Sequence, residues 1–311
     1  MFPEYISQFA EGLTVEHGIA AGGAVLLGVW LLRTSFGRRS LADAPERPND
    51  LPFYMPFLLL FMWFAPAQLL VVAVQSLAED LPEWQKATLG NTAYVVASVG
   101  VSVMTLVAAR RHFRNGLTGF GLRIAAAPRD LGIALLNLLA VWPVIMAAML
   151  LTIKAAQLIW GEDYEMPQHE GLRLITEHSN LLLRVSIVVV ASIMAPLVEE
   201  LLFRGMLQTL IRSVLMYGPA AFVPDAGQSE AAPGHEPKPE GIAGKDGSAW
   251  PAIGITSLLF AIVHADMGHW PALFVLSLAL GYSYERSGSL LRPIFIHFLF
   301  NTITVIAVLY Q

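Results

Sequence analysis

At its most informative point the chain reads Ala195-Pro-Leu-Val-Glu-Glu-Leu-Leu-Phe-Arg-Gly-Met-Leu207, an apolar stretch that carries two adjacent carboxylates and an arginine. Ionisable groups in a membrane-spanning segment cost roughly 2.5–3.5 kcal/mol each on insertion scales and commonly mark functional sites. Glu200 and Arg204 are four positions apart, so on a helix they share a face and can pair. Glu199 lies about 100° round the helix from Glu200, which leaves it available for another partner. An ion pair that only fixes the edge of a span is the alternative interpretation.

The composition around this stretch is that of a membrane protein. Of the 311 residues, 55% are hydrophobic and 14% are charged, whereas a soluble domain carries about 25% charged residues. The mean hydropathy is +0.58. Because the chain has no cysteine, thiol catalysis, disulfides and cysteine-bound zinc are excluded. The small net charge of −5 and the lack of a basic patch argue against a nucleic-acid partner.

Eight apolar runs predict an all-α fold, a polytopic transmembrane bundle of about eight helices that forms one membrane domain over residues 1–311. A helix needs about 20 residues to cross a bilayer. The sixth run is short, and together with the seventh it could form a broken or re-entrant hairpin. Pro196 should bend the fifth run because it removes a backbone hydrogen bond. The runs lie near 13–32, 55–77, 90–109, 131–153, 184–211, 250–264, 271–285 and 293–310.

The distribution of basic residues predicts the orientation. If the N-terminus is outside, 15 of the 19 Lys and Arg residues fall on the cytoplasmic side, and Lys86, Lys154, Arg173 and Arg184 fall opposite. Both termini are therefore predicted to be extracytoplasmic. The acidic N-terminal segment lacks the early Lys or Arg of a cleavable signal, so the first run should stay as a span. A multi-pass protein of a prokaryotic plasma (inner) membrane is expected.

Three connections on the cytoplasmic side have distinctive compositions. Residues 33–52 form a loop rich in proline and charge, and residues 110–130 form a basic loop with Arg123 and Arg129 near the lipid headgroups. Residues 218–249 are rich in Gly, Pro, Ala and charge. Such a composition cannot bury a core, so the segment is predicted to be a flexible cytoplasmic loop insertion.

Two further apolar runs carry polar residues at helical spacing. Phe260 and His264 are four apart in one run, and His297 and Asn301 are four apart in another. A histidine in an apolar helix is most often a satisfied structural residue, and a hydrogen bond between packed helices would explain His297 with Asn301. Three polar segments in one chain make a shared site the better interpretation.

The residue types indicate which chemistry such a site could perform. Glu199 could serve as general base, and His264 could hold the same water or pass a proton to a leaving group. The side chains of His297 and Asn301 offer N–H donors for an oxyanion that develops on a carbonyl. The same glutamate, histidines and asparagine could instead hold a metal ion with an open position for water. No His-Glu-x-x-His run, Gly-x-Ser-x-Gly motif or phosphate cradle is present.

The order of these motifs resembles a known family. Glu199-Glu200-x-x-x-Arg204, Phe260-x-x-x-His264 and His297-x-x-x-Asn301 are similar to the three motifs of the CPBP family, the CAAX-protease and bacteriocin-processing membrane proteins, which include the type II CAAX prenyl endopeptidase. The resemblance covers roughly residues 184–310, which would be the catalytic core. The first four spans match only as generic membrane helices.

The resemblance implies an intramembrane glutamic endopeptidase. Glu199 and His264 would activate the water, His297 and Asn301 would form the oxyanion site, and Glu200, Arg204 and Phe260 would support them. The substrate would be a peptide or protein in or beside the bilayer, either prenylated or of the leader type, and no cofactor is implied, although metal stays open. The alternatives are a metal-dependent protease, or a non-proteolytic immunity, scaffold or carrier protein that uses the polar cluster structurally.

Overall fold

The computed structural model describes residues 15–164, 166, 170–218, 247–264 and 266–309. Within these ranges the regular elements are helices, and the β-pairing consists of an isolated bridge between Asn49 and Phe113. The predicted all-α fold is therefore confirmed. The helices that build the bundle are α2 (Val15–Arg33), α3 (Met55–Phe64), α4 (Pro66–Leu77), α5 (Glu83–His112), α7 (Ala127–Trp160), α9 (Leu181–Val188), α10 (Ala195–Glu200), α11 (Thr209–Tyr217), α13 (Ala249–Ile262), α14 (Trp270–Ser287) and α15 (Leu291–Leu309). Short helices are α6 (Gly116–Phe120), α8 (Glu170–Glu177), η1 (Ile124–Ala126) and η5 (Met267–His269).

Five of the described helices are long and apolar enough to cross a membrane. They are Met55–Leu77, Glu83–His112, Ile124–Trp160, Leu181–Tyr217 and Leu291–Leu309. All five coincide with predicted runs. Large apolar side chains on these helices, such as Leu77 and Leu158, are about nine-tenths exposed, as expected where lipid replaces water. The short sixth run is the 14-residue α13. It packs against α14, so that α13 and α14 form the two arms of a hairpin. The protein is thus a multi-pass helical membrane protein.

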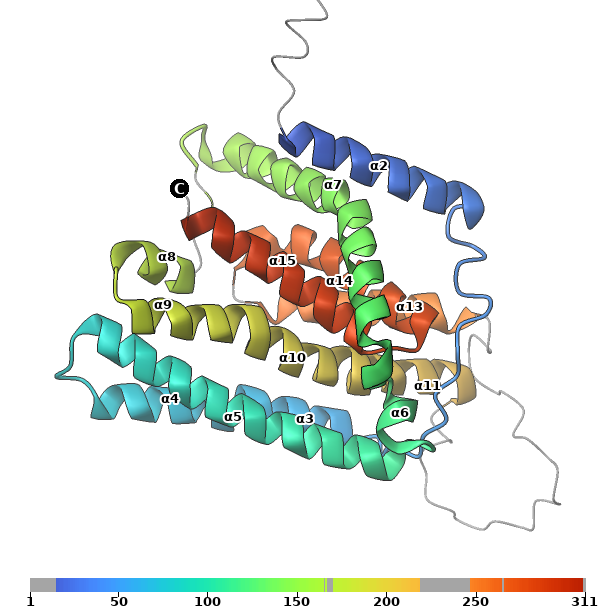
Figure 1. The fold of residues 1–311 in the computed structure, drawn as a ribbon, viewed down its shortest axis with the longest axis horizontal. Helices are drawn as coiled ribbons and strands as arrows, with labels where there is room; N and C mark the ends of the chain where they lie inside the picture. The colour runs from blue at the N-terminus through green and yellow to red at the C-terminus, as the bar shows by residue number, and fades with distance from the viewer. Residues whose placement is uncertain (1–14, 165, 167–169, 219–246, 265, 310–311) are drawn as a thin grey trace, which may run out of the picture.

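The fifth span, Leu181–Tyr217, lies at the centre of the described bundle. Figure 1 shows it between α3, α4 and α5 on one side and α14 and α15 on the other. Leu201, Leu202 and Phe203 on this span are buried against both groups of helices. Helix α7 packs against α2, α14 and α15, and α2 also reaches α14 directly, since Trp30 Nε1 donates to the hydroxyl of Tyr282 at 2.8 Å. Residues 195–207, which contain both glutamates and Arg204, therefore occupy the middle of the described bundle.

Two π-helical segments interrupt this central span, which the sequence predicted only to bend. Segment η2 covers Val189–Met194 and segment η3 covers Leu201–Gln208, so α10 with its two glutamates lies between them. Pro196 is at the start of α10, where it can donate no backbone hydrogen bond and its ring crowds the carbonyl four residues back. A wider turn just before the proline lets the helix continue. π-segments of this kind are frequent at functional sites.

The predicted loop at 33–52 is more ordered than its composition indicated. Residues 34–54, which we call the strap, run back along the end of the bundle, and Leu51 is fully buried in the core. The backbone N–H of Asp50 donates to the carbonyl of His112 at 3.0 Å, and the N–H of Arg114 donates to Pro48 at 3.1 Å. Most of the predicted loop at 218–249 lies outside the described residues.

Candidate active site

The helix α10 buries both glutamates of the first motif. Glu200 is fully buried, and the side chain of Glu199 is 11% exposed. Arg204, one turn later in η3, is also fully buried. Carboxylate and guanidinium groups are rarely buried unless they are paired, because removing a charge from water costs several kcal/mol. The partners of each group therefore indicate what it does.

Glu200 has a partner for each of its carboxylate oxygens. Arg204 Nε donates to Oε2 at 3.0 Å, as the spacing of four predicted, and His297 Nδ1 lies 3.0 Å from Oε1. The guanidinium of Arg204 also donates through Nη2 to Ser277 Oγ at 3.0 Å and lies 4.9 Å from the centre of the Phe260 ring. Glu200 and Arg204 thus join the central span to α13, α14 and α15.

Glu199 is less completely satisfied. Its Oε2 lies 3.8 Å from His297 Nε2, beyond hydrogen-bonding distance, and makes no hydrogen bond to the described residues. The imidazoles of His297 and His264 are both close enough to act on this carboxylate electrostatically. A buried carboxylate oxygen without a partner needs an explanation. Here it leaves an acceptor free for a water or a substrate group.

His297 lies between the two glutamates. Its Nδ1 faces Glu200 and its Nε2 faces Glu199, and the side chain is only 4% exposed. A hydrogen bond from Nδ1 to Glu200 would fix the ring orientation and the tautomer. The sequence grouped His297 with Asn301 as a pair of donors one helical turn apart on α15, and in the structure the two side chains have different partners. Asn301 Nδ2 donates instead to the carbonyl of Ala191 in η2 at 2.8 Å.

Phe260 and His264 form the second wall of the site. The Phe260 ring is fully buried against Phe203, His264 and His297, with ring centres 4.8–5.8 Å apart. His264 follows the end of α13 and is half-buried. Its Nδ1 lies 2.7 Å from the carbonyl of Phe260, which can only accept, so Nδ1 carries the hydrogen. In the neutral ring this leaves Nε2 as a free acceptor. Trp270 fixes the same turn by donating from Nε1 to the His264 carbonyl at 2.8 Å.

A polar ladder between η3–α11 and α14 supports the site and was missed by the sequence analysis. Arg204 bonds to Ser277, Gln208 to the carbonyl of Gly281, and Arg212 to Glu285. Each rung joins residues 73 positions apart, and successive rungs are four residues apart on both helices. The two helices therefore run in the same direction in a fixed register. The signal that could have revealed it was a polar residue at every fourth position of the first segment (Arg204, Gln208 and Arg212), together with Ser277 and Glu285 eight positions apart on α14.

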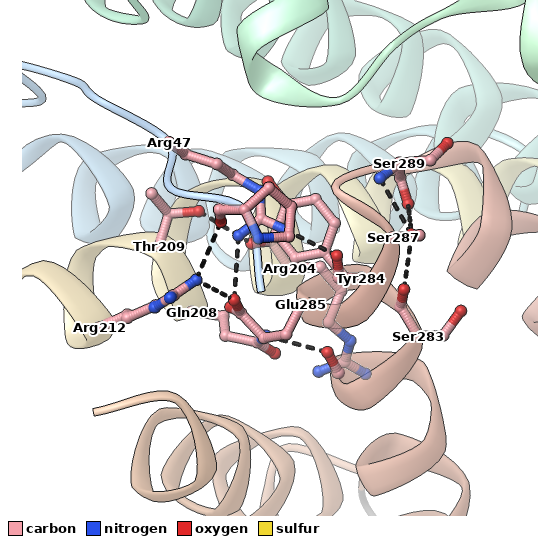
Figure 2. A network of polar contacts seen from close by, with 12 residues as sticks. Arg47, Arg204, Gln208, Thr209, Arg212, Ser283, Tyr284, Glu285, Ser287 and Ser289 are labelled. Atoms are coloured by element: carbon pink, nitrogen blue, oxygen red, sulfur yellow. Dashed lines mark hydrogen bonds and ion pairs between the residues drawn. The ribbon is translucent and has the colours of Figure 1, made fainter. Parts of the chain in front are cut away.

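The ladder ends in a buried cluster around Glu285, shown in Figure 2. Arg212 from α11, Arg47 from the strap and Gln208 from η3 all donate to the Glu285 carboxylate, Arg47 at 3.1 Å and Gln208 at 2.9 Å. Arg47 also donates to the carbonyl of Tyr284 at 2.6 Å and stacks over its ring. The strap is thus attached to the same helix that holds Arg204.

A metal centre receives no support from the geometry of the described residues. Within them, no three His, Asp or Glu side chains are grouped so as to hold a metal ion. Glu199, Glu200 and His297 are close to one another, but Glu200 and His297 are already engaged with each other. Metal dependence remains an alternative that chelation can test.

Comparison with known proteins identifies the segment that carries these residues. Residues 181–303 match a family model described as Type II CAAX prenyl endopeptidase Rce1-like. No curated protein and no solved structure matches the chain. The matched range contains all three motifs, so the resemblance inferred from them is confirmed and indicates a membrane protease of the hydrolase class. In this multi-pass membrane protein, the similarity to the Rce1-like CAAX protease family therefore covers residues 181–303.

Proposed function

We propose that the protein is a glutamate-dependent intramembrane endopeptidase that cleaves a peptide bond of its substrate, with Glu199 as the general base. The observation that carries this proposal is the difference between the two glutamates: both oxygens of Glu200 are bonded, whereas Oε2 of Glu199 makes no hydrogen bond to the described residues. A general base must be able to accept a proton from water within hydrogen-bonding reach. Glu199 meets this requirement and Glu200 does not.

In the proposed reaction, Glu199 takes a proton from a water molecule, and the water oxygen attacks the carbonyl carbon of the peptide bond. Glu199 then passes the proton it took from the water to the leaving nitrogen as the bond between that nitrogen and the carbonyl carbon breaks, so the products are a carboxylate and an amine. His264 helps to hold the water through its free Nε2. His297, held by Glu200, orients the Glu199 carboxylate, and Arg204 with Phe260 keeps Glu200 in place.

The oxyanion site needs a further assumption about Asn301. In the structure its amide donates to Ala191, a carbonyl in the wide π-helical turn. To stabilise an oxyanion, this amide would have to turn toward the substrate when it binds. His297 Nε2 is the second donor in the imidazolium form, in which both ring nitrogens carry a hydrogen. Asn301→Asp retains the side-chain size but removes the amide donor, so it should lower kcat more than it raises KM.

The substrate is proposed to be a membrane-associated peptide or protein, prenylated or of the leader type. The protein is proposed to lie in a plasma (inner) membrane with both termini extracytoplasmic, in a single membrane domain with its catalytic core over 184–310. Reporter fusions test the orientation: alkaline phosphatase joined after residue 311 should be active, and a fluorescent protein that folds only in the cytoplasm should be dark.

The test of the activity is cleavage of a peptide library, including prenylated peptides, by the full-length protein in detergent with mass-spectrometric detection. Glu199→Ala and His264→Ala should each lower the cleavage rate, Glu199→Ala by about 10²–10⁴-fold. Retained cleavage in Glu199→Ala would contradict the assignment of the base. Loss of activity with a chelator, restored by added metal, would favour the metal-dependent alternative. A wild-type protein that cleaves nothing would favour the structural, non-proteolytic alternative.

A further inference from the structure

A cavity lies where two membrane spans end on the same side of the bundle. Its volume is about 150 Å³. The span Glu83–His112 ends just before the residues that line it, and the span Ile124–Trp160 begins among them. One wall comes from the turn between these spans, a second from residues 45–48 of the strap, and a third from Ser287 and Gly288 at the end of α14. The cavity therefore lies at the level of the lipid headgroups.

The cavity is basic, and two of its arginines are free to bind a ligand. Arg114 and Arg123 are exposed, and within the described residues neither guanidinium has a hydrogen-bond or ion-pair partner. Arg47, the third arginine of the lining, is already bound to Glu285. An arginine that serves the fold is normally paired, as Arg47 is. The donors of the two exposed guanidinium groups that line this cavity are available to an anion.

The walls of this cavity are held in place before any ligand arrives. The backbone N–H of Arg114 donates to Pro48 at 3.1 Å, which joins the turn to the strap. The N–H of Leu290 donates to Gly121 at 2.9 Å, which joins the same turn to the connection after α14. Gly121 has a φ of +105°, and a Cβ there would meet Leu290 N at 2.8 Å, so this approach requires glycine. Preformed walls lower the entropic cost of binding.

We propose that this cavity, which we call the arginine pocket, binds a phosphate group supplied by the headgroup of an anionic lipid. The planar guanidinium is suited to phosphate because it can donate two parallel hydrogen bonds. Anionic lipids are concentrated in the cytoplasmic leaflet, the side to which the basic residues assign this end of the bundle. One water needs roughly 10–15 Å³ of such a cavity, so the pocket has room for a group of several atoms.

The lining also includes an acidic residue, Glu46, which opposes an anion. It is exposed to solvent, so its repulsion is screened. Removal of the arginines should therefore weaken phosphate binding, and a control variant that loses two arginines outside the cavity separates this effect from a general loss of surface charge.

The experiment compares two double variants of the full-length protein in non-ionic detergent. Arg114→Gln with Arg123→Gln alters the pocket, and Arg38→Gln with Arg39→Gln removes two exposed arginines of the strap that do not line it. Native mass spectrometry measures binding of a short-chain phosphatidylglycerol, and inorganic phosphate is titrated as a competitor. Without lipid, both variants should melt within ~2 °C of the wild type, since exposed side chains without partners contribute little to stability.

The pocket variant should bind phosphatidylglycerol about tenfold more weakly than the control variant, as expected for the loss of charge-assisted hydrogen bonds. Failure of millimolar inorganic phosphate to compete supports a lipid source. Effective competition still supports a phosphate site but assigns it to a soluble ligand. Equal affinities of the two double variants would overturn the proposal.

Discussion

The carboxylates of Glu285 and Glu199 are both buried, but they differ in how many of their oxygens are hydrogen-bonded. Both oxygens of Glu285 are bonded, Oε1 to Gln208 and Oε2 to Arg47 and Arg212. Glu199 has an oxygen that bonds to none of the described residues and faces His297 at 3.8 Å. A fully paired carboxylate fixes the positions of the helices around it. A carboxylate with a free oxygen, held among histidines, is available for proton transfer.

The largest effect on stability is expected at the paired carboxylate. Glu285→Gln leaves Arg47 and Arg212 buried without a counter-charge, and breaking a buried pair in this way costs about 3–5 kcal/mol. The thermal unfolding midpoint in detergent should fall sharply, and the strap should become sensitive to protease. Asp43→Asn, which removes an exposed carboxylate from the same strap, is the control and should leave the midpoint nearly unchanged. An unaltered midpoint in Glu285→Gln would show that the cluster does not hold the helices together.

A smaller effect on stability is expected at the other end of the ladder, where Arg204 bonds to Ser277. Ser277→Ala removes the acceptor of the bond from Nη2, and hydrogen bonds to charged groups contribute about 1.5–3 kcal/mol. Since Arg204 holds Glu200, the variant should lose cleavage activity as well as stability. Ser283→Ala is a matched control, because Ser283 Oγ is buried in the same helix and makes no hydrogen bond to the described residues. Equal effects of both substitutions would contradict the role of the ladder.

The smallest effect is expected at the middle rung. A Cβ on Gly281 would lie 2.7 Å from Gln208 Oε1 and 3.0 Å from Ile253 Cγ2, so Gly281→Ala must push α14 away from η3. Overpacking of this kind costs about 1–3 kcal/mol, reduced where a flexible side chain can move. Gly254→Ala is the control, since a Cβ there meets nothing within 4 Å. A midpoint for Gly281→Ala equal to that of Gly254→Ala would show that the close approach is not needed.

The sequence predicted those parts of the molecule that depend on local spacing. The spans follow from the lengths of apolar runs, and the Glu200–Arg204 pair follows from a separation of four residues on a helix. The gathering of Glu199, His264 and His297 was inferred from three polar motifs in apolar segments. In the structure, His297 Nε2 lies 3.8 Å from Glu199 Oε2, and the rings of both His264 and His297 pack on Phe260.

Features that depend on distant parts of the chain could not be predicted in this way. The π-segments on both sides of α10 change which side chains face α14 and α15, and apolar periodicity contains no signal for an additional residue in a turn. Asn301 was expected beside His297, but the carbonyl of Ala191 in the wide turn is its partner. The strap was taken for an open loop because the partner that buries Arg47 lies 238 residues further along the chain.

The most direct test of the central claim compares Glu199→Gln with Glu200→Gln in one preparation, measuring single-turnover peptide cleavage and thermal unfolding of each. Glu199→Gln should abolish measurable cleavage with little change in the unfolding midpoint, because the oxygen it replaces makes no hydrogen bond within the described protein. Glu200→Gln should lower the midpoint strongly, because Arg204 loses its buried counter-charge. A Glu199→Gln protein that cleaves at the wild-type rate, or a Glu200→Gln protein that is inactive yet as stable as the wild type, would contradict the account.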